Sequence, residues 1–156
     1  ACPRSATRIR GRAFATTAIS TGERLRVADT SFLYALFSES DEFHGRALSE
    51  AARAEAILVP GEILSETLSL VQYRQGHAAA RAVGEWIRGQ AGLEIGVSSR
   101  KRLEKVWAAF VSGRGRLSYP DAVVVAWCEG RGVEPLAFDE ALLHALRGRA
   151  PGRQPS

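Results

Sequence analysis

The amino-acid sequence predicts an α/β protein in which a short parallel sheet carries helices on both faces. Short apolar runs alternate along the chain with longer segments whose apolar residues recur at helical spacing. Alternating strands and helices form parallel sheets, because each helix crosses back over the sheet before the next strand begins. The 156 residues suffice for one compact domain with a buried core.

The composition is typical of a soluble globular protein, with 46% hydrophobic and 24% charged residues. No apolar run approaches the ~20 residues of a membrane span, and no signal-peptide pattern is present, so we expect a cytoplasmic location. The two cysteines, Cys2 and Cys128, form no C-x-x-C pair. This arrangement favours a reducing compartment, with neither a disulfide framework nor a zinc site.

The positive charge is concentrated at the two ends of the chain. Residues 1–24 and 147–156 together contain eight basic residues and one acidic residue, which leaves a net charge of −3 for residues 25–146. We predict a basic, disordered extension over 1–24, a domain over 25–146 and a basic, flexible tail over 147–156. A transit peptide, or a natural start near residue 25, are alternative interpretations of the first segment. The overall basicity therefore says little about what the domain binds.

The domain begins with a strand over residues 25–28 that leads directly into a helix with apolar residues at 32, 33, 36 and 37. Asp29 stands at the junction. An acid there caps the helix, which is worth ~1 kcal/mol, or lies in the ligand crevice at the carboxyl end of the strand. Taken alone, the position favours the cap.

The next elements repeat this alternation. We expect a helix over 41–55, a strand over 56–59 closed by Pro60, a helix that Gly76 ends, a helix over 78–90 and a strand over 93–97. His44, in the first of these helices, is expected to be an exposed surface residue. Glu66 lies one turn inside the helix that follows Pro60, where a solvated glutamate is the ordinary interpretation.

Ser98 and Ser99 precede an amphipathic helix whose apolar residues lie at 103, 106, 107, 110 and 111. Gly113 and Gly115 end this helix. Basic residues cluster at its start and in the turn after it; such charges are usually solvated, and a patch that contacts phosphate is the alternative. The candidate nucleic-acid contacts are Arg100, Lys101, Arg102, Lys105, Arg114 and Arg116.

Ser118 and Pro120 are typical of the start of a helix, and Asp121 lies in its first turn, where the helix dipole favours an acid. Residues 122–128 are apolar on every side, which predicts a buried helix. A fourth strand over 133–138 is followed directly by Asp139, which starts a last helix through Leu146. Asp121 and Asp139 are therefore two further acids at element junctions.

Four acids are predicted to meet at one edge of the sheet, because the carboxyl ends of parallel strands share an edge. They are Asp29, Glu66, Asp121 and Asp139. Carboxylates brought close together repel, so they need a counterion or raised pKa values. Mg²⁺ or Mn²⁺ suits such a cluster, because hard divalent cations prefer oxygen ligands.

The segments VADTSFLYALF, VPGEILSETL, LSYPDAVVVAWCEGRG and PLAFDEAL, in this order, resemble the PIN-domain ribonucleases and, within them, the VapC-type toxins of toxin–antitoxin pairs. The resemblance covers residues 25–146 and implies a PIN-like three-layer fold with a short central parallel sheet flanked by helices. It implies that the four acids are catalytic residues and metal ligands, with Ser31 and Ser118 as polar supports. Glu66 rather than Glu62 matches the family position, because Thr-Leu follows it.

The sequence departs from the family pattern at two positions near the last acid. Ala137 stands where a Thr or Ser is frequent, and Leu142 stands where an aromatic residue is frequent. Neither change removes a metal ligand. Both departures lie close to Asp139, so the match to the family pattern is weakest for this acid.

The resemblance further implies a Mg²⁺-dependent ribonuclease, with Mn²⁺ able to substitute, that cleaves RNA phosphodiester bonds with metal-activated water. Asp29 and Asp121 would be the principal ligands of one or two ions, and Glu66 and Asp139 would be ligands or would orient metal-bound water. A homodimer and a small cognate antitoxin are implied as well. The alternatives are a stand-alone PIN nuclease of RNA processing or decay and a non-catalytic PIN-like binding module. A phosphatase or another phosphoryl-transfer enzyme is a third alternative; it would ordinarily need an activated nucleophile or a phosphate-binding loop, and no G-x-x-x-x-G-K-[ST] segment occurs.

Overall fold

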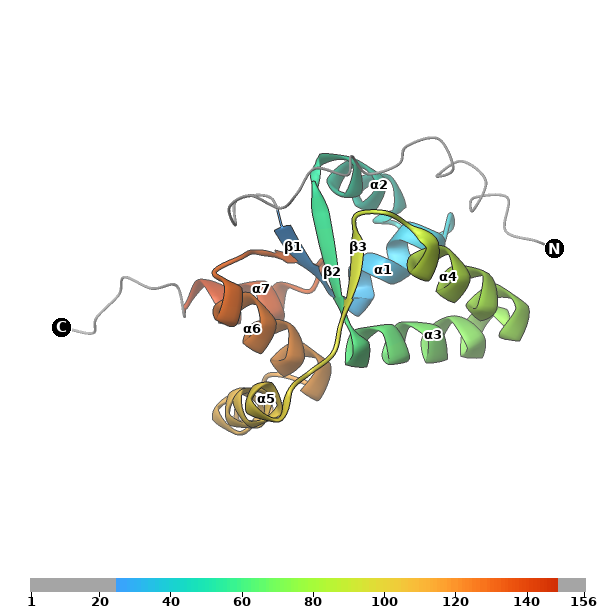
Figure 1. Ribbon diagram of the computed structural model, residues 1–156. Helices are drawn as coiled ribbons and strands as arrows, with labels where there is room; N and C mark the ends of the chain where they lie inside the picture. The colour runs from blue at the N-terminus through green and yellow to red at the C-terminus, as the bar shows by residue number, and fades with distance from the viewer. Residues whose placement is uncertain (1–24, 149–156) are drawn as a thin grey trace.

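The computed structural model describes residues 25–148, which form an α/β fold around one parallel sheet (Figure 1). The sheet contains β1 (Leu25–Ala28), β2 (Ala56–Pro60), β3 (Leu93–Gly96) and β4 (Pro135–Leu136) in the order β3-β2-β1-β4. All its neighbouring strands pair in parallel. The predicted fold class is therefore confirmed. The predicted extension over 1–24 and residues 149–156 of the predicted tail lie outside the described residues.

Helices flank the sheet on both sides. In Figure 1 the sheet is seen nearly edge-on, with α3 and α4 on its right and α6 and α7 on its left. The helices of the described segment are α1 (Thr30–Phe37), α2 (His44–Arg53), α3 (Gly61–Gln75), α4 (His77–Gly89), α5 (Arg100–Ser112), α6 (Tyr119–Arg131) and α7 (Glu140–Arg147). None of them combines the length and apolarity needed to cross a membrane.

Three elements are shorter than the sequence predicts: α2, β4 and, by one residue, β3. Helix α2 begins at His44 instead of residue 41, because the carboxylate of Asp41 accepts a hydrogen bond from the backbone N–H of Phe43 and forms a turn. His44 is half-buried, not exposed, and its Nδ1 lies 2.8 Å from the carbonyl oxygen of Ala35. Strand β4 has two residues, because the N–H of Phe138 donates to the side chain of Ser31 instead of continuing the strand ladder.

The core joins the sheet to buried residues of α1, α3, α4 and α6. Every residue of β2 is buried, and so is each residue of α6 from Ala122 to Cys128, as the all-round apolar pattern of that segment predicts. Burial raises the pKa of the Cys128 thiol to about 12. The thiol therefore stays protonated at neutral pH and acts as a small core residue.

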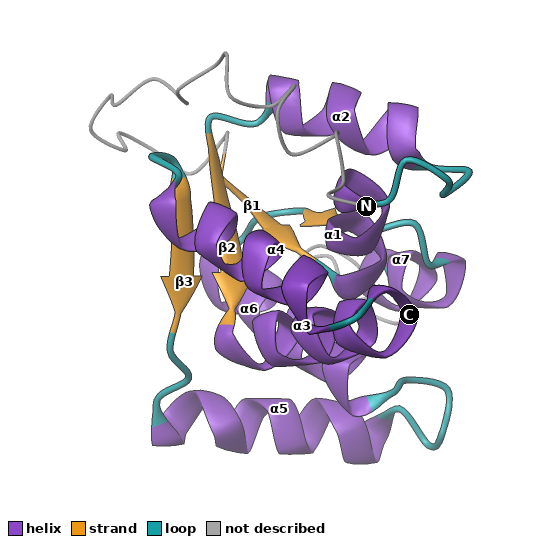
Figure 2. Cartoon of the chain, turned by 90° about the vertical axis from the view of Figure 1, so that its right-hand side faces the viewer, coloured by secondary structure: helices purple, strands orange, loops and turns teal. Residues whose placement is uncertain are grey.

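Helix α5 packs against α6 as the first arm of a helical hairpin. The ring of Phe110 contacts that of Tyr119 at one end, and Arg102 lies over the ring of Trp127 at the other, 3.9 Å from its centre. The two helices therefore run in opposite directions. A Cβ atom at Gly96 would lie 2.6 Å from Trp127, so only glycine leaves room for this ring beside the end of β3. Figure 2 shows α5 crossing below the tips of the strand arrows.

Candidate active site

The carboxyl ends of β1 and β4 place two of the predicted acids on neighbouring segments. The two strands pair in parallel, and the backbone N–H of Asp29 donates to the carbonyl oxygen of Leu136 over 2.9 Å. Asp29 directly follows β1, and Asp139 follows β4 after two connecting residues. Both acids thus stand at the same edge of the sheet.

Asp29 is both a helix cap and a buried charge. Its side chain is only 5% exposed, and its Oδ2 accepts hydrogen bonds from the N–H of Ser31 (3.2 Å) and from the hydroxyl of Ser31 (2.7 Å). Burial raises the pKa of Asp29, the negative charge of Asp121 raises it further, and the hydrogen bonds from Ser31 oppose this rise. Asp29 and Asp121 are therefore close enough to repel each other.

Ser31 ties the first junction to the last one. Its hydroxyl donates to Asp29 and also accepts the backbone N–H of Phe138 over 3.1 Å. Phe138 precedes Asp139, and its ring stacks on Phe43 with 4.8 Å between centroids and 14° between planes. Ser31 thus supports one predicted acid directly and helps to hold the segment that leads to another.

Glu66 is connected to the same junction through Thr30. The hydroxyl of Thr30 donates to Oε2 of Glu66, across 36 positions of sequence. Thr30 is absent from the predicted site residues, and the one sequence signal for it is a hydroxyl next to the first acid. Glu62, one turn earlier on α3, has a buried carboxylate oxygen without a hydrogen-bond partner among the described residues. Its charge acts on Arg102 instead.

Asp121 is the third residue of α6 and forms a capping box with Ser118. Its Oδ2 accepts the N–H and the hydroxyl of Ser118, each over 2.7 Å, and the Ser118 hydroxyl accepts the N–H of Asp121 over 3.2 Å. Both of these hydrogen bonds to the carboxylate end on Oδ2. The capping box therefore leaves Oδ1 of Asp121 without a capping hydrogen bond. Ser118 therefore orients the carboxylate of Asp121.

Asp139 differs from the other acids in its exposure to solvent. Its side chain accepts the N–H of Leu142 over 3.0 Å and caps α7. Both residues that depart from the family pattern are buried: Ala137 is 8% exposed and Leu142 is fully covered. The described structure links Asp139 to the other acids only through the backbone beside it.

Within residues 25–148, no three Asp, Glu, His or Cys side chains converge closely enough to hold a metal ion as they stand. Burial is the main cause of the raised pKa of Asp29, to which the charge of Asp121 adds, and Glu66 is attached beside Asp29 through Thr30. The donor chemistry fits a hard divalent cation, because every candidate ligand is a carboxylate oxygen.

Comparison with known proteins identifies the family to which this arrangement belongs. A family model described as the PIN domain matches residues 26–147. The chain belongs to the PIN-domain family. Among solved structures, it is similar to the VapC20 toxin of Mycobacterium tuberculosis, described as cleaving the sarcin–ricin loop, with 27% sequence identity and a TM-score of 0.70. The match covers 78% of this chain and 94% of that one. A search of curated proteins found no match.

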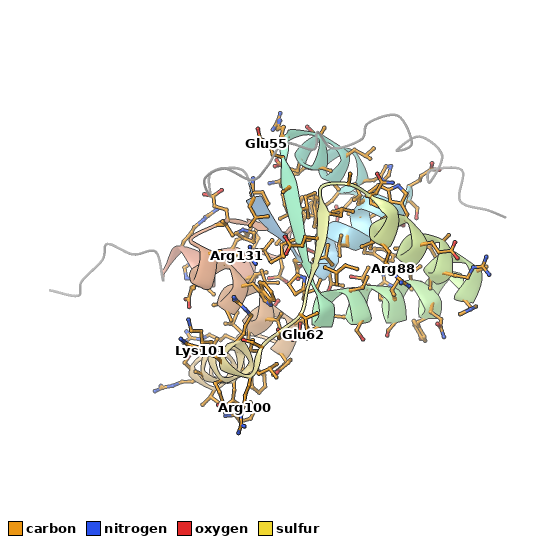
Figure 3. The ribbon with its side chains drawn as sticks, viewed as in Figure 1. Glu55, Glu62, Arg88, Arg100, Lys101 and Arg131 are labelled. Atoms are coloured by element: carbon orange, nitrogen blue, oxygen red, sulfur yellow. The ribbon has the colours of Figure 1, made fainter. Side chains whose placement is uncertain are left out.

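These findings confirm the predicted resemblance to PIN-domain proteins of the VapC type and support a ribonuclease of the toxin kind. In this PIN domain, the predicted basic contacts fall into two groups. Arg114 and Arg116 lie in the turn before Ser118, and the remaining four stand in the first half of α5. About 20 Å separates the two ends of a 13-residue helix such as α5. Figure 3 shows the side chains of Arg100 and Lys101 pointing outward from α5.

Proposed function

We propose that this PIN domain is a Mg²⁺-dependent ribonuclease and the toxin of a toxin–antitoxin pair. The observation that carries the proposal is Asp29, a buried carboxylate with a raised pKa beside the charge of Asp121. Such a pair is unfavourable unless a proton or a cation neutralises it, and perturbed acids of this kind cluster at functional sites. The similarity to a VapC toxin supports the activity class.

Asp29 and Asp121 would hold one or two Mg²⁺ ions, and Mn²⁺ would substitute. Glu66 and Asp139 would complete the catalytic set as ligands or as acceptors that orient water. The chemistry that bound Mg²⁺ would supply is polarisation of the RNA phosphate and a lower pKa of a coordinated water. The protein contributes orientation: Ser31 holds the carboxylate of Asp29, Thr30 holds Glu66 and Ser118 holds Asp121.

The test is cleavage of a labelled RNA by the full chain with Mg²⁺, with EDTA, and by the variant Asp29→Asn with Mg²⁺. We expect EDTA and the substitution each to lower the rate by ~10²-fold or more, which corresponds to the several kcal/mol that a metal supplies. Glu85→Gln is the matched control, because Glu85 is an exposed acid on α4 that pairs only with Arg81 in the described structure. Equal rates for Asp29→Asn and the unsubstituted protein would refute the proposal.

We also propose that the protein acts in the cytoplasm, as a homodimer inhibited by a small antitoxin. This proposal rests on the similarity to a protein described as a toxin. Induced expression of the chain would arrest growth, and Asp29→Asn would not. Sedimentation would show a species of twice the chain mass. Unimpaired growth with an active nuclease would favour the stand-alone RNA-processing enzyme instead.

A further inference from the structure

A serine residue binds one carboxylate oxygen of the first predicted acid, and another serine does the same for the third. The hydroxyl of Ser31 donates to Oδ2 of Asp29 over 2.7 Å. The hydroxyl of Ser118 donates to Oδ2 of Asp121 over 2.7 Å. In both cases the backbone N–H of the serine donates to the same oxygen, over 3.2 Å and 2.7 Å respectively. One oxygen of each acid is therefore held by the protein through two donors.

Glu66 shows the same arrangement with a single donor. The hydroxyl of Thr30 donates to Oε2 of Glu66, and the described structure contains no second hydrogen bond to this carboxylate. Thr30 is the first residue of α1 and stands between Asp29 and Ser31 in the chain. The hydroxyl of Thr30 is thus the one group of the described structure that holds back an oxygen of Glu66.

The number of carboxylate oxygens on offer distinguishes one divalent cation from another. Mg²⁺ demands an octahedral shell of about six oxygens and usually takes one or two carboxylates together with several waters. Ca²⁺ takes about six to eight oxygens and accepts both oxygens of one carboxylate. A carboxylate with one oxygen held by a hydroxyl can bind through both oxygens only after that hydrogen bond breaks. Hydrogen bonds to charged groups are the strong ones, so this requirement disfavours Ca²⁺.

We propose that the hydroxyls of Thr30, Ser31 and Ser118 make the site selective for Mg²⁺ and Mn²⁺ over Ca²⁺. Each hydroxyl holds back one carboxylate oxygen and leaves the other for the ion. Thr30 contributes most, because backbone N–H groups also support the two serine contacts, whereas Glu66 depends on the threonine hydroxyl. This inference rests on the proposed metal-dependent function and adds the residues that exclude Ca²⁺.

The test is isothermal titration calorimetry of the full chain with Mn²⁺ alone and with Ca²⁺ alone. The quantity compared is the ratio of the Kd for Ca²⁺ to the Kd for Mn²⁺. Thr30→Val replaces the hydroxyl with a methyl group and keeps a β-branched side chain, so it frees Oε2 of Glu66 with little change of shape. We expect the ratio to fall by roughly tenfold or more, since a hydrogen bond to a charged group no longer opposes Ca²⁺.

Three further variants show whether the hydroxyl causes the change. Thr30→Ser keeps a hydroxyl and should keep the ratio of the unsubstituted chain. Ser118→Ala should lower the ratio by a smaller factor than Thr30→Val, because the N–H of residue 118 still donates to Asp121. Ser69→Ala is the matched control and should leave the ratio unchanged, because the Ser69 hydroxyl, on the same helix as Glu66, donates to the carbonyl oxygen of Ser65 over 2.8 Å.

An equal ratio in Thr30→Val and the unsubstituted chain would overturn the inference, whatever the two affinities are. Circular dichroism checks that each variant folds; if Thr30→Val does not, an unchanged ratio in Ser118→Ala overturns the inference instead. Absence of Mn²⁺ binding to the unsubstituted chain would refute both the proposed metal dependence and this inference. A chain that shows the expected change of ratio but cleaves no RNA would refute the proposed nuclease function and leave this inference standing.

Discussion

Asp29 and Asp139 occupy the same local position at two strand-to-helix junctions, yet their surroundings differ. Each side chain caps the following helix by accepting a backbone N–H, from Ser31 over 3.2 Å and from Leu142 over 3.0 Å. Asp29 is 5% exposed and has a raised pKa, whereas Asp139 is exposed to solvent. The comparison shows that an exposed capping acid and a buried capping acid share the same local motif, and that only the tertiary surroundings distinguish them.

The difference originates in the strand order. Strand β1 lies inside the sheet, between β2 and β4, whereas β4 is an edge strand of two residues. The end of β1 is therefore covered by elements on both sides, including the start of α6 with Asp121. The end of β4 has a neighbour on one side only.

The largest effect expected from this difference is on stabilisation by metal. Mn²⁺ at about 100 times its Kd should raise the free energy of unfolding of the unsubstituted protein by ~2.7 kcal/mol. Asp29→Asn should abolish this gain, and Asp139→Asn should keep the larger part of it, since Asp139 is exposed to solvent whereas Asp29 is buried. Urea unfolding with Mn²⁺ and with EDTA measures both values. Equal losses in the two variants would contradict the distinction drawn between the acids.

Ser31→Ala breaks the connection between the two junctions. Its hydroxyl bonds both Asp29 and the N–H of Phe138, so the free energy of unfolding should fall by ~1–3 kcal/mol. The hydrogen bonds from Ser31 favour the charged carboxylate and lower the pKa of Asp29, so their loss should raise that pKa further. In a plot of cleavage rate against pH, the fall in rate on the acidic side should consequently begin at a higher pH.

The control for this experiment is Ser49→Ala, because Ser49 is exposed on α2. It should leave both the stability and the pH profile unchanged. An acid limb that stays in place in Ser31→Ala would show that Ser31 has only a structural role.

The smallest effect concerns the cap of α7. Asp139→Ala removes the acceptor for the N–H of Leu142 and should lower the free energy of unfolding by ~1 kcal/mol. Asp139→Asn keeps a capping oxygen and should change it by no more than a few tenths of a kcal/mol. Thermal unfolding in EDTA separates this capping term from any metal term. Equal losses in Asp139→Asn and Asp139→Ala would show that the charge, which both variants lack, stabilises this helix instead of the capping oxygen.

Features that depend on local pattern were predictable from the sequence. The all-round apolar run from Ala122 to Cys128 is a buried helix, and the serine, proline and acid before it form its cap. The hydrogen bond from Thr30 to Glu66 spans 36 residues, and no periodic pattern in the sequence predicts it. The same holds for His44, whose half-buried position depends on a carbonyl group of α1. An amphipathic pattern likewise marked α5, but it did not indicate that Trp107 would remain exposed.

By itself, the sequence determined where strands pass into helices and which junctions carry an acid, because apolar spacing and capping chemistry act over a few residues. Tertiary structure alone decided which of those acids is buried and which other charge lies beside it. Asp29 is the example: its raised pKa depends on burial and on Asp121, 92 positions later in the chain. Desolvation and Coulomb repulsion depend on distances in space, and the order of the strands and the start of α6 set those distances.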